Sequence, residues 1–501
     1  MRTISILLFA GIWLSGCVTV SKPFSPERKY GSEDLQKDFD IYRKLLESHH
    51  PGLYWYTAKD SMDLYFETGR AQLKDSLTEP QFRNILNAVT ARINCGHTVV
   101  RTSKQWSRYA DTAGIRSLFP LSFKVWEDAM VVTGSLHRND SIFRRGTVVT
   151  AINGLSWDRI ADTLFGYIAA DGYNRTHKYQ SLSNRGFFGS LYTALFGAAD
   201  SYHISYRDPL GNEKTVIVPA YRPQADTSGR TGTRSFRPST PPTPKQRREQ
   251  RLNAVRLLRI DTLNRSAMMD LGTFARGYRL KSFFRRSFRM LDHQNIGHLI
   301  IDLRSNGGGS VTNSTLITRY LAKARFRIAD TLYAIRKKGP WSSYIRNHFW
   351  NRLFMTVFTR KRKDGFFHFG YYERHAFRPK RKHHFDGQVY LLTGGNTFSA
   401  ATLMAVSLVR QENVTIVGEE TGGGAHGNSA WLIPDAELPQ TGVRFRLPLF
   451  RLVIDRHFPH DGRGLMPEVP SIPTIEGIRR NTDFKVEKTM ELIRAAKQKT
   501  E

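Results

Sequence analysis

The chain has 501 residues, of which 40% are hydrophobic and 12% aromatic, and its formal net charge is +31. This composition excludes a chain that is disordered throughout, and the length exceeds that of one ordinary domain. So basic a surface attracts polyanions such as lipid head groups or nucleic acid. No zinc-finger spacing or RNA-binding aromatic signature accompanies the charge. We therefore do not expect a nucleic-acid partner, whereas an anionic lipid surface stays open as one.

The first 17 residues have the pattern of an export signal. Arg2 gives a positive start, and the apolar run from Ile4 to Leu14 is too short to span a bilayer. Leu-Ser-Gly-Cys then ends at Cys17 and resembles the bacterial lipobox, in which the cysteine is acylated and becomes the mature N-terminus. We therefore expect a lipid anchor at Cys17 that attaches the protein to a membrane. An ordinary signal peptide with a chance cysteine is the alternative.

The anchor predicts residence in the cell envelope. No acidic residue occurs from Val18 to Lys22, which by analogy with known sorting patterns favours an outer-membrane lipoprotein that faces the periplasm. Only Cys95 remains after Cys17, so no intramolecular disulfide is expected.

The N-terminal half divides into a helical part and a strand-rich part. Residues 18–32 are polar and predict a tether, and residues 33–110 have helical spacing, with helices expected near 34–46, 60–73 and 78–93. Residues 115–221 shift towards a period of two, with strands at 121–125, 130–133 and 147–152 and a helix at 157–168. The stretch 146–168 resembles the distal part of a PDZ-like domain.

The C-terminal half predicts an α/β core. Residues 222–252 are rich in Pro, Ser, Thr, Gly and Arg and predict a flexible linker. In residues 253–475, apolar strands at 297–302, 388–393 and 414–418 alternate with a helix at 398–410, which predicts a largely parallel sheet. A basic, aromatic insertion at 337–384 could cover the active site or touch the membrane, and a surface excursion is the default interpretation. Residues 476–501 predict a C-terminal helix.

Three strand ends carry residues that could perform chemistry. Ser399 follows the strand 388–393 and a turn, and it precedes a helix, where unpaired backbone N–H groups can stabilise an anion. The second strand runs into Asp302-Leu-Arg-Ser-Asn-Gly-Gly-Gly309, and the third into Gly418-Glu-Glu-Thr-Gly-Gly-Gly424. The glycine-rich turn after Asp302 lacks the Gly-Lys-Ser/Thr ending of a phosphate loop, so we reject phosphate transfer. Each motif alone would fit an ordinary turn or an N-cap serine.

Together the three motifs resemble the tail-specific, or C-terminal-processing, serine peptidases, over roughly residues 267–470. The resemblance implies a crotonase-like α/β fold joined to a PDZ-like domain. It also implies that Ser399 is the nucleophile, and that the backbone N–H groups of Ala400 and of Gly307 or Gly308 form the oxyanion hole.

The general base departs from the commonest pattern of that family. Many members place a lysine where this chain has Gly424, and no lysine occurs between Lys382 and Lys485, which excludes a Ser–Lys dyad from this segment. The tricorn-like branch uses a histidine, and Asn94-Cys-Gly-His97-Thr matches its Gly/Ser-His-Thr pattern. A neutral imidazole can accept the serine proton at physiological pH, so His97 is the expected base.

An orienting carboxylate would complete the site, and the sequence offers two. Asp461 aligns with the family glutamate near the end of the catalytic domain but is one carbon shorter, and an Asp-Gly turn is its alternative role. Glu420 follows a core strand and is the other candidate.

We therefore predict a serine endopeptidase that cleaves envelope proteins or peptides through an acyl-enzyme, without metal or cofactor. A catalytically inactive binding protein on the same fold is the main alternative. An envelope scaffold and a hydrolase of non-peptide acyl substrates also remain open.

Overall fold

The structure is a computed structural model that describes residues 24–112, 118–223 and 242–498. The export signal, Cys17 and the start of the predicted tether lie outside the described residues. The end of that tether is ordered, because β1 (Lys29–Tyr30) pairs with β2 (Leu77–Thr78). In the described ranges, no helix combines the length and the apolarity that crossing a bilayer requires.

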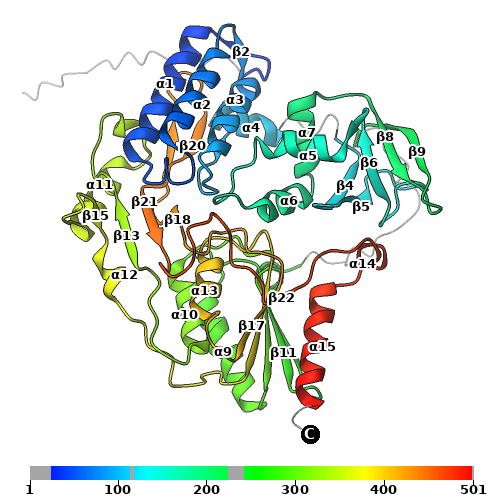
Figure 1. The fold of residues 1–501 in the computed structure, drawn as a ribbon, viewed down its shortest axis with the longest axis vertical. Helices are drawn as coiled ribbons and strands as arrows, with labels where there is room; N and C mark the ends of the chain where they lie inside the picture. Colours follow the sequence, from blue (N-terminus) through cyan, green and yellow to red (C-terminus); the bar gives the residue numbers. More distant parts are fainter. Residues whose placement is uncertain (1–23, 113–117, 224–241, 499–501) are drawn as a thin grey trace, which may run out of the picture.

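The N-terminal part is a helical bundle (Figure 1), as the helical spacing predicts: α1 (Ser32–His49), α2 (Lys59–Ala71) and α3 (Glu79–Arg92). A capping box formed by Thr78 and Gln81 starts α3, with a proline in its first turn. The chain then forms β3 (Val100–Arg101) and α4 (Lys104–Thr112). Strand β3 pairs with β20 (Arg444–Arg446), which pairs with β19 (Asp435–Glu437), so the bundle is joined to the C-terminal half.

The strand-rich part is an antiparallel sheet in the order β4-β5-β6-β8-β9. Its strands are β4 (Leu121–Trp126), β5 (Ala129–Ser135), β6 (Val148–Ile152), β8 (Ser201–Arg207) and β9 (Glu213–Pro219), and β7 (Leu155–Ser156) pairs with β6. Three helices accompany it: α5 (Trp157–Phe165), α6 (Arg175–Ser183) and α7 (Phe187–Phe196). The outer edge of β4 is covered by α6, since the Val125 N–H donates to the Ser183 hydroxyl at 3.0 Å.

The C-terminal half contains the predicted α/β core. The sheet order is β10-β11-β12-β16-β17-β22, parallel from β11 onward. Its strands are β10 (Arg256–Asp261), β11 (Ser266–Leu271), β12 (His298–Asp302), β16 (Gln388–Thr393), β17 (Val414–Gly418) and β22 (Val469–Pro470). The predicted core strands are thus confirmed.

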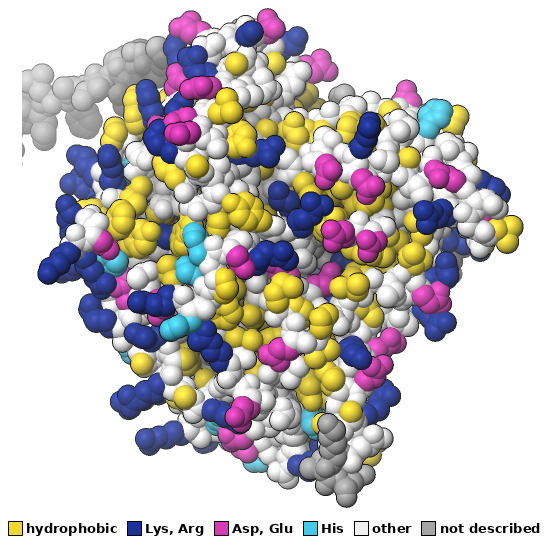
Figure 2. All heavy atoms as spheres, viewed as in Figure 1, with side chains coloured by type: hydrophobic (Ala, Val, Ile, Leu, Met, Phe, Trp, Pro, Cys, Tyr) yellow, Lys and Arg dark blue, Asp and Glu magenta, His cyan; other side chains and the backbone are white. Residues whose placement is uncertain are grey.

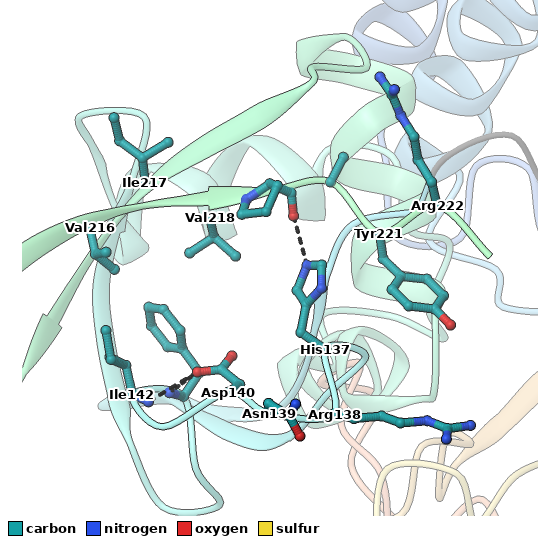
Figure 3. Close-up of a pocket in the computed structure, with 13 residues that line it drawn as sticks. His137, Arg138, Asn139, Asp140, Ile142, Val216, Ile217, Val218, Tyr221 and Arg222 are labelled. Atoms are coloured by element: carbon teal, nitrogen blue, oxygen red, sulfur yellow. Dashed lines mark hydrogen bonds between the residues drawn. The ribbon is translucent and has the colours of Figure 1, made fainter. Parts of the chain in front are cut away.

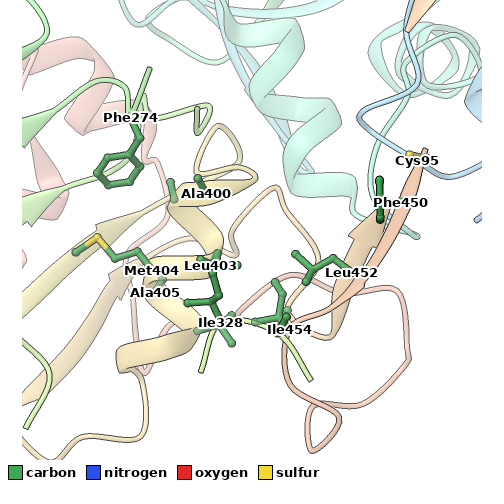
Figure 4. Packing of buried hydrophobic residues seen from close by; sticks show 14 of the residues in the cluster. Cys95, Phe274, Ile328, Ala400, Leu403, Met404, Ala405, Phe450, Leu452 and Ile454 are labelled. Atoms are coloured by element: carbon green, nitrogen blue, oxygen red, sulfur yellow. The ribbon is translucent and has the colours of Figure 1, made fainter. Parts of the chain in front are cut away.

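Helices cover both faces of this core sheet (Figure 1). On one side lie α9 (Leu280–His293), α10 (Val311–Leu321) and α13 (Ala400–Leu408). On the other side lies α15 (Phe484–Gln498), where Ile493 packs on Tyr390 and Leu392; the shorter α14 (Ile475–Arg480) precedes it. Figure 4 shows Leu403 and Met404 of α13 within the large hydrophobic cluster. Burial on both faces explains why these strands are almost continuously apolar.

The insertion is built around a second sheet in the order β14-β15-β13-β21-β18. It comprises β14 (Arg360–Lys361), β15 (Phe367–His368), β13 (Thr331–Ala334), β21 (Phe450–Val453) and β18 (Gly427–Ala430), with η1 (Ser342–Tyr344), α11 (His348–Phe358) and α12 (Gly370–Arg374). The default interpretation of 337–384 as a surface excursion is therefore incomplete, since this segment contributes strands to a sheet.

Two other sequence predictions need correction. The predicted linker ends in a helix, α8 (Pro244–Asn253), which starts at a capping box formed by Thr243 and Gln246. This helix has no buried residue, so it leaves no hydrophobic period in the sequence. The single helix predicted after residue 475 is two helices, because Asn481 adopts a left-handed conformation between them.

Candidate active site

Ser399 is the last residue before α13, at the end of the turn that follows β16. Its backbone angles are φ 55° and ψ −121°, a conformation that costs a non-glycine residue on the order of 1–3 kcal/mol. Neighbouring bonds hold the turn: the Phe398 N–H donates to the Asn306 carbonyl at 3.0 Å, and the Thr397 hydroxyl donates to the Leu303 carbonyl at 2.9 Å. This strained serine at a strand–turn–helix junction has the geometry of a nucleophile elbow.

Ser399 lines a cavity of about 490 Å³. The cavity lies between the glycine-rich turn after β12, the start of α13 and strands β18 and β21. Tyr372 of the insertion and Trp431 also line it, with ring centroids 4.4 Å apart, and Arg276 is the one charged residue in the lining. The insertion therefore contributes to the wall of the site, as one of the sequence alternatives proposed.

His97 reaches this region from the N-terminal bundle. Its buried ring packs against Phe398, the residue before Ser399, with 4.8 Å between ring centroids. Among the described residues, neither ring nitrogen of His97 has a hydrogen-bond partner, so the Ser399–His97 hydrogen bond is not formed in this structure. The fold thus brings together the base and nucleophile segments, which are 302 residues apart in the sequence. It leaves the imidazole free to form a new bond.

The carboxylate beside His97 is Asp171, which the sequence analysis missed. One Asp171 oxygen lies 3.8 Å from His97 Nδ1, and Asp171 is buried. The N–H of Gly96 donates to Asp171 at 2.9 Å and that of Gly424 at 3.4 Å. Burial favours the neutral acid, yet the His97 imidazole and the two N–H donors hold the pKa of Asp171 below its ordinary value. Asp171 is thus an anion aimed at the imidazole.

The two carboxylates predicted from the sequence are engaged elsewhere. Glu420 is buried and accepts hydrogen bonds from Arg463 at 2.9 and 3.0 Å, the Gly464 N–H at 2.7 Å and the Thr176 hydroxyl at 2.9 Å. Asp461 is exposed and accepts from the Arg463 N–H, which is the Asp-Gly turn that was its alternative role. Among the described residues, Asp171 is the one carboxylate within 4.0 Å of a His97 nitrogen. The structure therefore corrects the expected position of the carboxylate.

Gly424 now has a structural explanation. A Cβ atom there would lie 2.6 Å from the Gly427 carbonyl oxygen, so a lysine would require a backbone shift. The Gly424 N–H instead donates to Asp171. Gly424 stands where many tail-specific peptidases place a lysine base. In this chain, the residue at that position instead provides a hydrogen-bond donor to Asp171, the carboxylate beside His97.

The predicted oxyanion donors are placed differently by the structure. The Gly308 N–H already donates to the Asn306 side chain at 2.9 Å, and Gly307 does not line the cavity. Gly309 and Ala400 do line it, and in the described chain their N–H groups have no backbone acceptor. A Cβ at Gly308 would lie 2.7 Å from that of Ser399, so Gly308 is needed for close approach. By this geometry, the N–H groups of Ala400 and Gly309 are the candidates for an oxyanion hole.

Cys95 lies beside the base, and ligand atoms of Cys95, His97 and Asp171 fall within 4.8 Å of one another. Such a set could in principle hold a metal ion. Burial raises the pKa of the Cys95 thiol to about 11, which disfavours the thiolate that metal binding needs. The Cys95 thiol instead contacts the Ser429 carbonyl at 3.8 Å. The arrangement therefore suits proton transfer by His97 better than metal binding.

A second cavity, of about 550 Å³, lies beside β9, where Ile217 and Tyr221 line it (Figure 3). His137 spans part of it through a 2.9 Å hydrogen bond to the Pro219 carbonyl. Ser399, Gly309 and Ala400 line the first cavity and not this one, so the chemistry belongs to the cavity at Ser399.

Fold and site together define a serine hydrolase on an α/β peptidase core. Residues 265–469, about two fifths of the chain, match the model of peptidase family S41, and this match together with the site makes the protein a serine-type peptidase. No curated protein sequence matches the chain.

Solved structures extend the similarity of fold beyond this domain. The structure of mature CPAF complexed with lactacystin is 14% identical, with a TM-score of 0.64 over 93% of this chain and 98% of that one. Mature CPAF is 15% identical, with a TM-score of 0.62 over 93% and 97% of the two chains. At these identities the likeness shows a shared fold.

Proposed function

We propose that this chain is an envelope endopeptidase of the tail-specific type, in which Ser399, His97 and Asp171 form the catalytic triad. The carrying observation is that the His97 ring contacts Phe398, the residue before the elbow serine, while the Asp171 carboxylate lies 3.8 Å from His97 Nδ1. A nucleophile, a base and an orienting anion in this order are the three parts that an acyl-transfer site needs.

In the proposed mechanism, His97 takes the Ser399 proton as the serine attacks a peptide carbonyl. No existing hydrogen bond of the imidazole has to break for this movement, because both ring nitrogens lack partners among the described residues. Catalytic hydrogen bonds are often long before substrate binds and shorten in the complex. Asp171 stabilises the imidazolium, and the N–H groups of Ala400 and Gly309 bind the oxyanion. His97 then protonates the leaving amine, and water hydrolyses the acyl-enzyme.

The cavity supports a peptide with an apolar side chain at the cleavage point. Its wall includes Tyr372, Trp431, Leu403 and Leu452, and no acidic residue lines it. Apolar walls with few polar groups favour apolar side chains.

Envelope residence rests on the sequence pattern at Cys17. Cells that express the chain should incorporate labelled palmitate into it, and Cys17→Ala should abolish the label. Incorporation that persists in Cys17→Ala would refute the anchor.

An activity-based fluorophosphonate probe tests the catalytic proposal. Wild type should be labelled, Ser399→Ala should not, and His97→Ala should react at least 100-fold more slowly, because the hydroxyl loses its base. Lactacystin, which is complexed with mature CPAF in a solved structure, should compete with the probe. A folded wild-type protein that resists the probe and cleaves no peptide would instead favour the inactive binding protein.

A further inference from the structure

Helix α11 of the insertion exposes a row of large apolar side chains. Phe349, Trp350, Leu353 and Val357 are 61%, 65%, 44% and 53% exposed. At about 100° per residue these four positions fall on one side of the helix, within an arc of about 100°. Met355 on the opposite side is buried against the body. The apolar row is therefore not the face that α11 uses to pack on its own protein.

Basic residues surround this row. Nine Lys and Arg residues and no Asp or Glu occur between Asp330 and Asp364, at positions 336, 337, 338, 346, 352 and 360–363. Figure 2 shows Lys and Arg gathered with hydrophobic side chains along the left margin, where Figure 1 draws α11, β15 and α12. Lys361 and Lys363 are exposed. The surface thus combines an apolar ridge with positive charge.

Helix α9 is also basic but lacks the exposed apolar row of α11. It exposes Lys281, Arg285, Arg286 and Arg289, but Met290 is its one large apolar residue that is exposed. Charge alone therefore occurs elsewhere on this protein, whereas α11 adds aromatic and aliphatic side chains, among them a tryptophan. Trp, Phe and Leu on one face with Lys and Arg beside them is the pattern of helices that lie in a membrane interface.

We propose that α11 and its flanking basic residues dock the protein on an anionic phospholipid surface, with Phe349, Trp350 and Leu353 inserted among the lipids. We assign an anionic lipid as the binding partner because of the charge. The 33 residues from 331 to 363 contain no carboxylate side chain, so this region is complementary to phosphate head groups. This inference does not depend on catalysis or on acylation of Cys17.

Docking through α11 would also orient the active site. An aromatic series leads inward from this helix: Phe354 and Phe358 contact Phe369, Phe369 contacts Tyr372, and Tyr372 contacts Trp431 in the cavity wall. The docked enzyme would therefore hold its cavity near the lipid surface.

The test is co-sedimentation of residues 24–501 with phosphatidylcholine vesicles that contain or lack 30% phosphatidylglycerol. This chain contains every described helix and strand and all three hydrophobic clusters, so it keeps the fold without the apolar run or any acyl chain. Wild type should bind the anionic vesicles at least tenfold more tightly than the neutral ones. High salt should weaken this binding.

Matched variants separate insertion from general charge attraction. Trp350→Gln with Leu353→Gln should lower the partition coefficient at least tenfold. Leu210→Gln with Leu263→Gln, which removes apolar side chains that are 86% and 94% exposed elsewhere, should leave it within twofold. Lys361→Gln with Lys363→Gln should weaken binding more than Lys281→Gln with Arg289→Gln on α9.

Three results would overturn the proposal. First, wild type could bind anionic and neutral vesicles equally. This result is measured on the wild-type protein alone and does not depend on the folding of any variant. The α11 and control variants could lose binding equally, which would indicate charge attraction only. Light scattering could show a dimer that the α11 variant disrupts, which would assign the ridge to a second copy of the chain. The melting temperature reports the fold of each variant, and fluorophosphonate labelling of Ser399 reports catalysis separately, so loss of fold, loss of catalysis and loss of docking are distinguishable.

Discussion

Replacing Asp171 by Asn tests the assignment of the triad most directly. The change keeps the shape of the side chain and one acceptor oxygen for the Gly96 N–H, and it removes the charge beside His97. At 3.8 Å, a carboxylate and an imidazolium attract each other by about 4 kcal/mol if the effective dielectric constant is about 20. That energy stabilises the charged imidazole of the transition state, so its loss corresponds to roughly a 1,000-fold decrease in kcat/KM.

The assay is kcat/KM on a quenched fluorescent peptide, together with the rate of fluorophosphonate labelling. Asp461→Asn should change neither rate by more than about threefold, because Asp461 is exposed and bonds only to its own turn. Glu420→Gln should lower the free energy of unfolding, because the buried Glu420 carboxylate forms an ion pair with Arg463. The reasoning is refuted if Asp171→Asn, folded as judged by its melting temperature, keeps kcat/KM within tenfold while Asp461→Asn loses it.

Three further predictions concern stability and the elbow. Lys485→Met should destabilise the protein by roughly 3 kcal/mol in urea unfolding, because it leaves the Glu419 carboxylate unpaired, and a second change of Glu419 to Gln should recover much of the loss. Gly308→Ala should slow probe labelling at least 100-fold, since φ is +92° and the new methyl group would lie 2.7 Å from the Cβ of Ser399; Gly307→Ala, with open space around it, should label normally. Burial lowers the pKa of His50 from 6.5 to about 3, so between these values acidification protonates only the unfolded chain, and the free energy of unfolding should fall by about 1.4 kcal/mol per pH unit from this residue. Chemical denaturation at several pH values in this range measures how the free energy of unfolding depends on pH. This dependence should be weaker for His50→Asn than for wild type, and an unchanged dependence would contradict the assignment.

The sequence by itself determined the parts of the site that depend on local structure. Ser399 was predictable because an apolar strand, a glycine turn and a helix start are contiguous in the chain, and they alone produce an elbow. The absence of lysine near Gly424 pointed to another base, and the residues around His97 resembled a known pattern. The parallel core was predictable because strands buried on both faces must be continuously apolar.

Only the tertiary structure decided which groups meet. Asp171 lies in an ordinary loop between α5 and α6, and it becomes a partner of His97 because three distant segments pack together there and Gly96 and Gly424 supply N–H donors. Likewise, only the structure shows that the Gly308 N–H already donates to the Asn306 side chain, which makes Gly309 the better candidate for an oxyanion donor. A local pattern can specify an element and its ends, whereas a carboxylate's distance from an imidazole is set by packing between residues that the sequence keeps far apart.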